Sequence, residues 1–284
     1  MKTKITVIIP TYQEEKRIAV CLKSVLPIAS RVILMDNMST DATCDIAQSL
    51  GAEVIRSEKT YKERVQEAID RPDIDTDWIM YVDADEVITE RAAAEIRELC
   101  DKYQNTQVTG IVCRYRKVFM GKELVHSGSD EWKVRLFKKG AAELEQHIEL
   151  HEHIVLKYGK TAGMKKSHIL HYSYSDVNQL TIKQNAFARR GAEELIRLDA
   201  GEESIEYKGL APVSKIRRAI KFKLYRRLPI GVRSWLSYAY QYYGHLGFLD
   251  GIEGKMYVYF RYYWYNMLTD AYYLEMKKQK EHAK

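Results

Sequence analysis

The segment Trp78–Glu86 places three acidic residues directly after a short apolar run. Residues 78–82 are aromatic, aliphatic and β-branched, which is typical of a buried strand. Acids at such a place also cap helices, and Thr89 predicts the start of one. A carboxylate taken from water nevertheless needs a partner, and Mg²⁺ and Mn²⁺ prefer hard oxygen ligands. The segment therefore predicts a buried strand that delivers acids to a cation-binding edge of a sheet.

Two earlier apolar runs, residues 4–9 and 31–35, are also followed by polar side chains. Further patterns predict helices at 14–26, 41–50 and 61–69, and a strand at 52–56. This alternation predicts an α/β fold, a doubly wound and mostly parallel sheet with flanking helices. Ligands bind such sheets outside the carboxyl ends of the strands, where Glu14, Asp36 and Asp85 are expected to meet.

Three motifs in this order resemble the family 2 glycosyltransferases: residues 7–15, 34–43 and 81–86. These are inverting enzymes of the GT-A fold that use nucleotide sugars. Further segments make the chain similar to the branch that adds sugars to lipopolysaccharide core or related bacterial surface glycans: residues 135–140, 151–152, 171–174 and 247–251. The resemblance implies a Rossmann-like GT-A domain that transfers a hexose.

The resemblance also implies roles for ten residues. It implies a nucleotide-sugar site made of Pro10, Thr11, Tyr12, Glu14, Asp36, Asp83 and Ala84. It implies that Asp85, aided by Asp83, and His171 hold Mg²⁺ or Mn²⁺ on the diphosphate. In an inverting transfer a base takes the proton of the acceptor hydroxyl, and the match favours Glu152, with Glu149 as second choice.

Several of these side chains also have an alternative, purely structural interpretation. Asp36 in isolation also suits a helix N-cap, and Glu14 a solvated acid in the first turn of a helix. Five of the eight histidines lie between residues 147 and 171, but no His-Glu-x-x-His motif or nearby cysteine supports a zinc site. Arg135 and Lys183 are further candidates for contacts with phosphate or acceptor.

The basic residues gather toward the C-terminal end. From residue 211 onward, 14 Lys and Arg stand against 5 Asp and Glu, together with 12 of the 21 tyrosines. Residues 215–227 are cationic and apolar at once, which suits an anionic bilayer surface. Nucleic-acid binding is the weaker interpretation because no nucleic-acid motif accompanies the charge.

Residues 252–274 are hydrophobic almost all round, but four charged residues interrupt them. A bilayer-spanning helix needs about twenty uninterrupted apolar residues, so this segment is not predicted to cross a membrane. Packing against the catalytic domain or a second copy accounts for part of the pattern. Interfacial tyrosine and tryptophan rings on the other side are compatible with that packing.

The cysteines and the N-terminal segment indicate the cellular compartment. The four cysteines are scattered without a Cys-x-x-Cys pair, so buried thiols are expected rather than a disulfide framework. The apolar N-terminal run is too short for a signal peptide and ends at Pro10. We therefore expect a reducing cytosol.

Together these observations predict a GT-A nucleotide-sugar-binding and catalytic domain at 1–210 and a helical, basic-aromatic, membrane-associating region at 211–284. The expected reaction moves a hexose from a UDP-linked donor to a hydroxyl of a lipid-linked glycan such as lipopolysaccharide core, by metal-assisted single displacement. The expected place is the cytoplasmic face of the inner membrane, on its anionic leaflet, with no nucleic acid as partner and self-association left open. Two alternatives remain: transfer to a polyprenyl phosphate carrier, which needs no base, and a catalytically weakened scaffold that binds a membrane or a partner.

Overall fold

A computed structural model describes residues 3–128, 130–144, 154–174, 176–200 and 228–282. These residues divide into two compact units. The first unit comprises residues 3–117, 130–144 and 154–172, and the second comprises residues 118–128, 173–174, 176–200 and 228–282. The sequence predicts a boundary at residue 210, which lies outside the described residues, so that boundary stays a prediction.

One sheet runs through the first unit in the order β3-β2-β1-β4-β8-β6-β12-β5, and β11 (Lys160–Gly163) pairs with β6. The bounds are β1 Ile5–Thr11, β2 Arg31–Asp36, β3 Glu53–Arg56, β4 Trp78–Tyr81, β5 Glu86–Ile88, β6 Val108–Phe119, β8 Glu131–Lys138 and β12 Ile169–His171. Strands β1 to β4 are mutually parallel, whereas β8 is antiparallel to both β4 and β6. A separate pair is formed by β9 (Ala142–Leu144) and β10 (Ile154–Leu156). The predicted mostly parallel sheet is confirmed.

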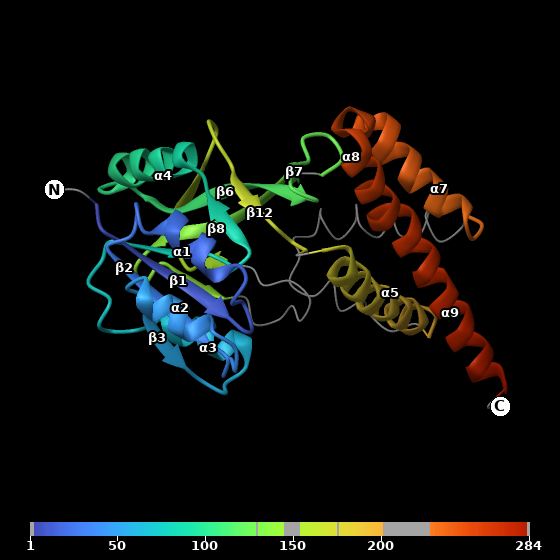
Figure 1. Cartoon of the computed structure of the whole chain (residues 1–284), viewed down its shortest axis with the longest axis horizontal. Coiled ribbons are helices and arrows are strands. Elements are labelled where there is room, and N and C mark those ends of the chain that lie inside the picture. The colour runs from blue at the N-terminus through green and yellow to red at the C-terminus, as the bar shows by residue number, and fades with distance from the viewer. Residues whose placement is uncertain (1–2, 129, 145–153, 175, 201–227, 283–284) are drawn as a thin grey trace. The chain divides into compact units, whose positions relative to one another are not determined.

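Helices α1 to α4 accompany the sheet, as Figure 1 shows. Their bounds are α1 Ile18–Val25, α2 Thr43–Ser49, α3 Tyr61–Ile69 and α4 Glu90–Tyr103. All residues of β1 and β4 are buried, because parallel strands are covered on both faces, which explains their continuous apolar runs. Helix α1 begins four residues later than predicted, since the carbonyl of Glu14 accepts hydrogen bonds from the N–H groups of Arg17 and Ile18 in a turn before it.

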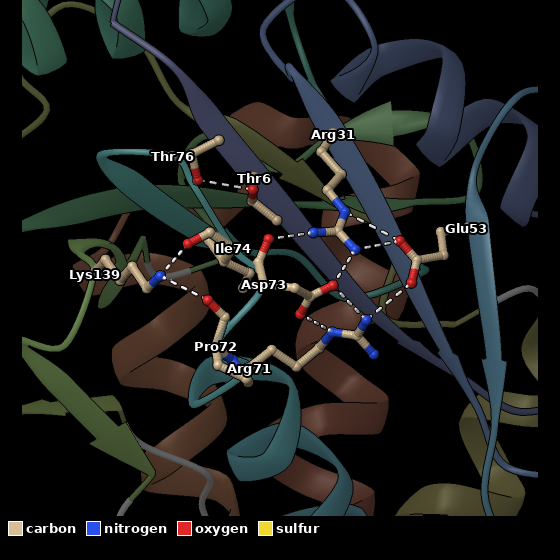
Figure 2. A network of polar contacts seen from close by, with 9 residues as sticks. All are labelled: Thr6, Arg31, Glu53, Arg71, Pro72, Asp73, Ile74, Thr76 and Lys139. Atoms are coloured by element: carbon tan, nitrogen blue, oxygen red, sulfur yellow. Dashed lines mark hydrogen bonds and ion pairs between the residues drawn. The ribbon is translucent and has the colours of Figure 1, made fainter.

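A polar network fastens the loop that leads into β4 (Figure 2). Arg31 and Arg71 both contact the carboxylates of Glu53 and Asp73, with nitrogen–oxygen distances between 2.6 and 3.1 Å. Hydrogen bonds from the two guanidinium groups hold the pKa of Asp73 well below its usual range. The network ties the loop to β2 and β3, which steadies the strand that carries the acids.

The second unit is mainly helical, as the sequence predicts for the C-terminal region. It contains β7 Lys122–Glu123, α5 Val177–Asp199, α7 Val232–Ala239, the π-helical turn η2 Tyr240–Gly244, the 3₁₀ turn η3 Gly247–Asp250, α8 Gly251–Val258, the π-helical turn η4 Tyr259–Trp264 and α9 Tyr265–His282. Helix α5 packs along α9 (Figure 1). None of the helices in the described ranges is both long and apolar enough to cross a bilayer.

Asp250 connects the second unit's helices to the loop at residues 125–127. Its carboxylate accepts hydrogen bonds from the N–H groups of Val125, His126 and Ser127 at 3.2, 2.9 and 2.7 Å. The hydroxyl of Ser127 donates a fourth at 2.6 Å. A Cβ at Gly254 would lie 2.7 Å from the carbonyl oxygen of Gly247, so this close approach requires glycine. The segment 247–251 thus has a structural role in this unit.

Candidate active site

A cavity of about 310 Å³ lies in the first unit at the carboxyl ends of the parallel strands. Four separate chain segments line it: the end of β1, helix α3, the residues after β4, and the end of β12. The lining residues are Pro10, Thr11, Tyr12, Glu14, Tyr61, Arg64, Asp83, Ala84, Asp85 and His171. Eight of the ten residues predicted from the sequence therefore lie around one cavity, at the place where parallel sheets bind ligands.

Asp85 and His171 face each other in this cavity. The Nε2 atom of His171 lies 3.7 Å from Oδ1 of Asp85, and the N–H of Tyr172 donates to the Asp85 carbonyl at 2.8 Å. Burial, and then the charges of Lys117 and Lys133, lower the pKa of His171, although Asp85 opposes the shift. His171 is therefore neutral at neutral pH, which is the form that can ligate a metal.

Asp83 is engaged on both carboxylate oxygens. Its Oδ1 accepts a hydrogen bond from the Tyr81 hydroxyl at 2.8 Å, and its Oδ2 accepts one from Nη2 of Arg135 at 2.9 Å. The Arg135 guanidinium also lies over the Tyr81 ring, 4.2 Å from the centroid. Arg135 is only 4% exposed, so the sequence-based idea that it contacts substrate gives way to a buried ion pair with Asp83.

Glu86 lies beneath this pair and is fully buried. Its Oε2 accepts the N–H of Asp83 at 3.1 Å. Burial, followed by the charge of Asp83, raises the pKa of Glu86 well above its usual value. For Arg135, the carboxylates of Asp83 and Glu86 outweigh burial and hold the pKa above its usual value. Arg135 is therefore the cation that compensates the carboxylates behind the cavity.

Glu14 forms a paired contact with Arg17. The guanidinium donates to the two Glu14 oxygens at 2.8 Å each, and it also donates to the carbonyl of Tyr172 at 3.3 Å. The Nη1 atom of Arg17 lies 4.0 Å from Oδ2 of Asp85. Glu14 is thus part of a charged group around Asp85 rather than an isolated solvated acid.

Asp36 lies outside the lining of the cavity and has no exposed side-chain surface. Ser39 donates to it twice, from its N–H at 2.8 Å and from its hydroxyl at 2.5 Å. The Nε atom of Arg56 lies 3.4 Å from Asp36 Oδ2. The N-cap of α2 is Ala42, so Asp36 does not cap that helix. Its contact with a nucleotide stays a prediction.

The cavity offers few side-chain donors to Mg²⁺ or Mn²⁺. Across the described ranges, no group of three or more His, Cys, Asp or Glu side chains is arranged to hold a metal. These cations are usually bound by one or two protein ligands together with substrate phosphates and water. The Asp85 carboxylate and the partly buried His171 imidazole supply such a partial set, so the residues fit a metal shared with a diphosphate.

The predicted base cannot be placed. Glu152, the second choice Glu149, and the neighbouring His147, His151 and His153 all lie outside the described residues. Lys183 belongs to the second unit, where its Nζ donates to the Ser173 carbonyl at 3.1 Å.

Sequence reasoning missed three residues at this site: Arg17, Tyr61 and Arg64. Arg64 is buried, its Nη1 donates to the Met35 carbonyl at 3.4 Å, and its Nε has no hydrogen-bond partner among the described residues. Burial lowers the pKa of Arg64. Their position in the sequence could have revealed two of them, because Tyr61 and Arg64 lie in the first turn of the helix that follows β3.

Comparison with known families and proteins gives one consistent result. The model of the family described as glycosyl transferase family 2 matches residues 6–170. An uncharacterized glycosyltransferase of Rickettsia typhi is 29% identical over 208 residues, and one of Rickettsia bellii is 30% identical over 215 residues. Each alignment covers 68% of this chain and 68% of the relative.

Two further similarities are more limited. Protein RfbJ of Shigella flexneri is 35% identical over 113 residues, which is 39% of this chain and 84% of RfbJ. The crystal structure of glucosyl-3-phosphoglycerate synthase from Mycobacterium tuberculosis, with Mn²⁺, UDP and glucosyl-3-phosphoglycerate, superimposes with a TM-score of 0.34 at 20% identity. That match covers 40% of this chain and 44% of the synthase.

Proposed function

This chain belongs to glycosyl transferase family 2, and from that premise we propose that its cavity binds a UDP-linked hexose and passes the sugar to a lipid-linked glycan. One observation carries the proposal. Eight predicted residues from three distant motifs line a single cavity of about 310 Å³ at the carboxyl edge of the sheet. Such an edge is where α/β folds bind nucleotides.

The residues of the cavity divide the work of donor binding. Pro10, Thr11 and Tyr12 form the wall that would contact the nucleoside, and Arg64 is a buried cation available to an anionic or carbonyl oxygen of the donor. Asp85 and His171 would hold Mg²⁺ or Mn²⁺. Bound there, the cation would neutralise negative charge on the leaving diphosphate. Arg135 holds Asp83 in place beside it through their contact at 2.9 Å.

Inversion at the anomeric carbon needs a single displacement by an acceptor oxygen. A carboxylate that accepts the hydroxyl proton at that moment assists the attack, and we assign this role to Glu152 on the family resemblance. We propose a hydroxyl of a lipid-linked glycan, such as lipopolysaccharide core, as the acceptor. The place of reaction would then be the cytoplasmic face of the inner membrane.

Calorimetry and a transfer assay test the donor site. UDP should bind with Mn²⁺ present and lose most of its affinity in EDTA, and Asp85→Asn should remove the metal dependence together with transfer. Asp101→Asn is a matched control, because Asp101 contacts Thr3 away from the cavity. Full turnover in excess EDTA, or an active Asp85→Asn protein, would refute the metal-assisted mechanism.

Glu152→Gln separates the acceptor classes. A hydroxyl acceptor needs a base, so turnover should fall by about 10²–10⁴-fold. A polyprenyl phosphate acceptor is already ionised, and unchanged turnover with that variant would favour it. A chain that binds no UDP with or without Mn²⁺ would instead fit the weakened scaffold.

A further inference from the structure

Helix α7 and the turn η2 are amphipathic with their polar side inward. Arg233, Ser234 and Gln241 are each no more than 6% exposed. Arg233 donates to Oδ2 of Asp270 at 2.8 Å, and Gln241 donates to the Ser127 carbonyl at 3.1 Å. In a water-soluble helix the polar face is the one that faces water. Here the polar residues are the packed ones, and Arg233 and Gln241 are held by partners in the same unit.

The opposite face of the same helix is apolar and exposed. It consists of Val232, Trp235, Leu236, Tyr240 and Tyr243, which recur every three or four residues and therefore form one stripe. Trp235, Tyr240 and Tyr243 are 58%, 66% and 62% exposed. An isolated exposed apolar side chain is ordinary, but a continuous exposed stripe marks an interaction surface.

The next helix repeats the arrangement. Leu249 of η3, Ile252 and Met256 of α8, and Tyr259 at the start of η4 are exposed along one side, whereas Tyr257 and Val258 are buried on the other. Helix α8 contacts η2, so the two stripes belong to elements that pack together. We call the nine residues of both stripes the outward aromatic surface.

The charged side chains near this surface indicate what kind of partner it binds. Within residues 228–259 no carboxylate is exposed: Asp250 is buried by its four hydrogen bonds, and Glu253 is partly buried beside Lys122 at 3.4 Å. The one exposed charged side chain in that range is Lys255. In the sequence, residues 215–227 directly precede this range with seven Lys and Arg and no acid. Tyrosine, tryptophan and cations without anions suit the interface of an anionic bilayer.

We propose that the outward aromatic surface is a lipid-docking surface, which inserts its rings and aliphatic side chains, from α7, η2, η3, α8 and the start of η4, into the interface of an anionic bilayer. It deepens the proposed function, since it names the residues through which an enzyme for lipid-linked acceptors would reach its membrane. The physical driving force is burial of exposed apolar area, assisted by cations at the headgroups.

Vesicle flotation of the full chain, without donor or acceptor, tests the surface. Vesicles of phosphatidylglycerol and phosphatidylethanolamine should float the protein, and phosphatidylcholine vesicles should float it less. Trp235→Ser combined with Ile252→Ser should lower the partition coefficient roughly tenfold or more, because two exposed side chains that the bilayer would bury are lost. Trp132→Ser is the matched control, since Trp132 is also an exposed tryptophan but lies in the first unit.

Quenching by brominated lipid adds a direct contact measurement. In a Trp132→Phe background, bromines in the acyl chains should quench the emission of Trp235, and Trp235→Phe should remove that part of the quenching. Both substitutions alter exposed side chains, and a thermal melt checks that each protein folds.

The outcomes are distinct. The lipid-docking role is contradicted if the wild-type chain does not float with anionic vesicles at low salt. It is also contradicted if the paired variant floats as well as the wild type. A further outcome is that sedimentation shows a dimer that Trp235→Ser dissociates, in a chain that binds no vesicles. That result assigns the surface to contact with a second copy and contradicts the lipid-docking role. A wild-type chain that transfers sugar but binds no vesicles overturns this inference alone, whereas a wild-type chain that binds vesicles but transfers no sugar overturns the proposed function alone.

Discussion

Nη2 of Arg135 on β8 lies 2.9 Å from Oδ2 of Asp83 after β4, and both residues sit beside fully buried Glu86. The guanidinium and the two carboxylates are stable only as a set, because Arg135 and Glu86 have left water and Asp83 is partly buried. The acid-rich end of β4 therefore depends on a cation supplied by a neighbouring antiparallel strand. The site's geometry and the stability of the sheet are coupled through this contact.

Arg135→Met should destabilise the first unit by about 3–5 kcal/mol, since it leaves carboxylates buried without a cation. Urea denaturation measures the loss. Arg135→Lys should lose less stability, and the double variant Arg135→Met with Asp83→Asn should recover part of it. Equal stability of wild type and Arg135→Met would show that the ion pair contributes nothing.

Arg64→Met should weaken UDP binding by about 1.5–3 kcal/mol, the range for hydrogen bonds to charged groups. The reason is that Arg64 is a buried cation in the cavity wall. Isothermal titration with UDP measures the effect. Arg91→Met, an exposed residue on α4, is the control and should bind UDP as the wild type does. Unchanged UDP affinity in Arg64→Met would remove this residue from the donor site.

Asp250→Asn should destabilise the second unit at neutral pH. Burial alone would raise the pKa of Asp250, but hydrogen bonds from Ser127, His126 and Val125 outweigh it and lower the pKa below its ordinary value of 3.8. A lowered folded-state pKa means that the carboxylate stabilises the fold above the ordinary pKa and loses this effect as pH falls through the folded value. The difference in stability between wild type and variant, followed by circular dichroism, should therefore shrink below about pH 4. A difference that grows with acid would contradict the assignment.

The thiols should react slowly in the folded protein. All four cysteines are free, and Cys21, Cys100 and Cys113 are buried. Burial raises the pKa of Cys113 to about 12 and that of Cys44 to about 11, so few thiolates exist at pH 8. Titration with a chromogenic disulfide should show Cys44 reacting first and all four reacting after urea is added. If two or more thiols react rapidly in the native protein, the burial of these cysteines is contradicted.

Much of the fold could be predicted from the sequence because its signals are local. Apolar runs marked β1, β2 and β4, and the topology of a parallel sheet brings the residues after such strands to one edge. That rule was enough to place Glu14 and Asp85 at one cavity, whereas Asp36, expected beside them, lies outside its lining. His171 was placed there through the family motif. The helix of residues 61–69 was predicted with the bounds that the structure shows, since Thr60 and Glu63 form a capping box.

Tertiary structure alone decided which charges pair and which helix face is inside. Asp83 and Arg135 are 52 residues apart, and no local pattern states that an arginine on β8 will neutralise an acid after β4. A helix with one polar and one apolar face, as α7 has, ordinarily turns its apolar face to the interior. The opposite is found, because Arg233 and Gln241 have partners at Asp270 and Ser127, which are distant in sequence. A hydrophobic pattern defines two faces of a helix, but only the groups packed against it determine which one is exposed.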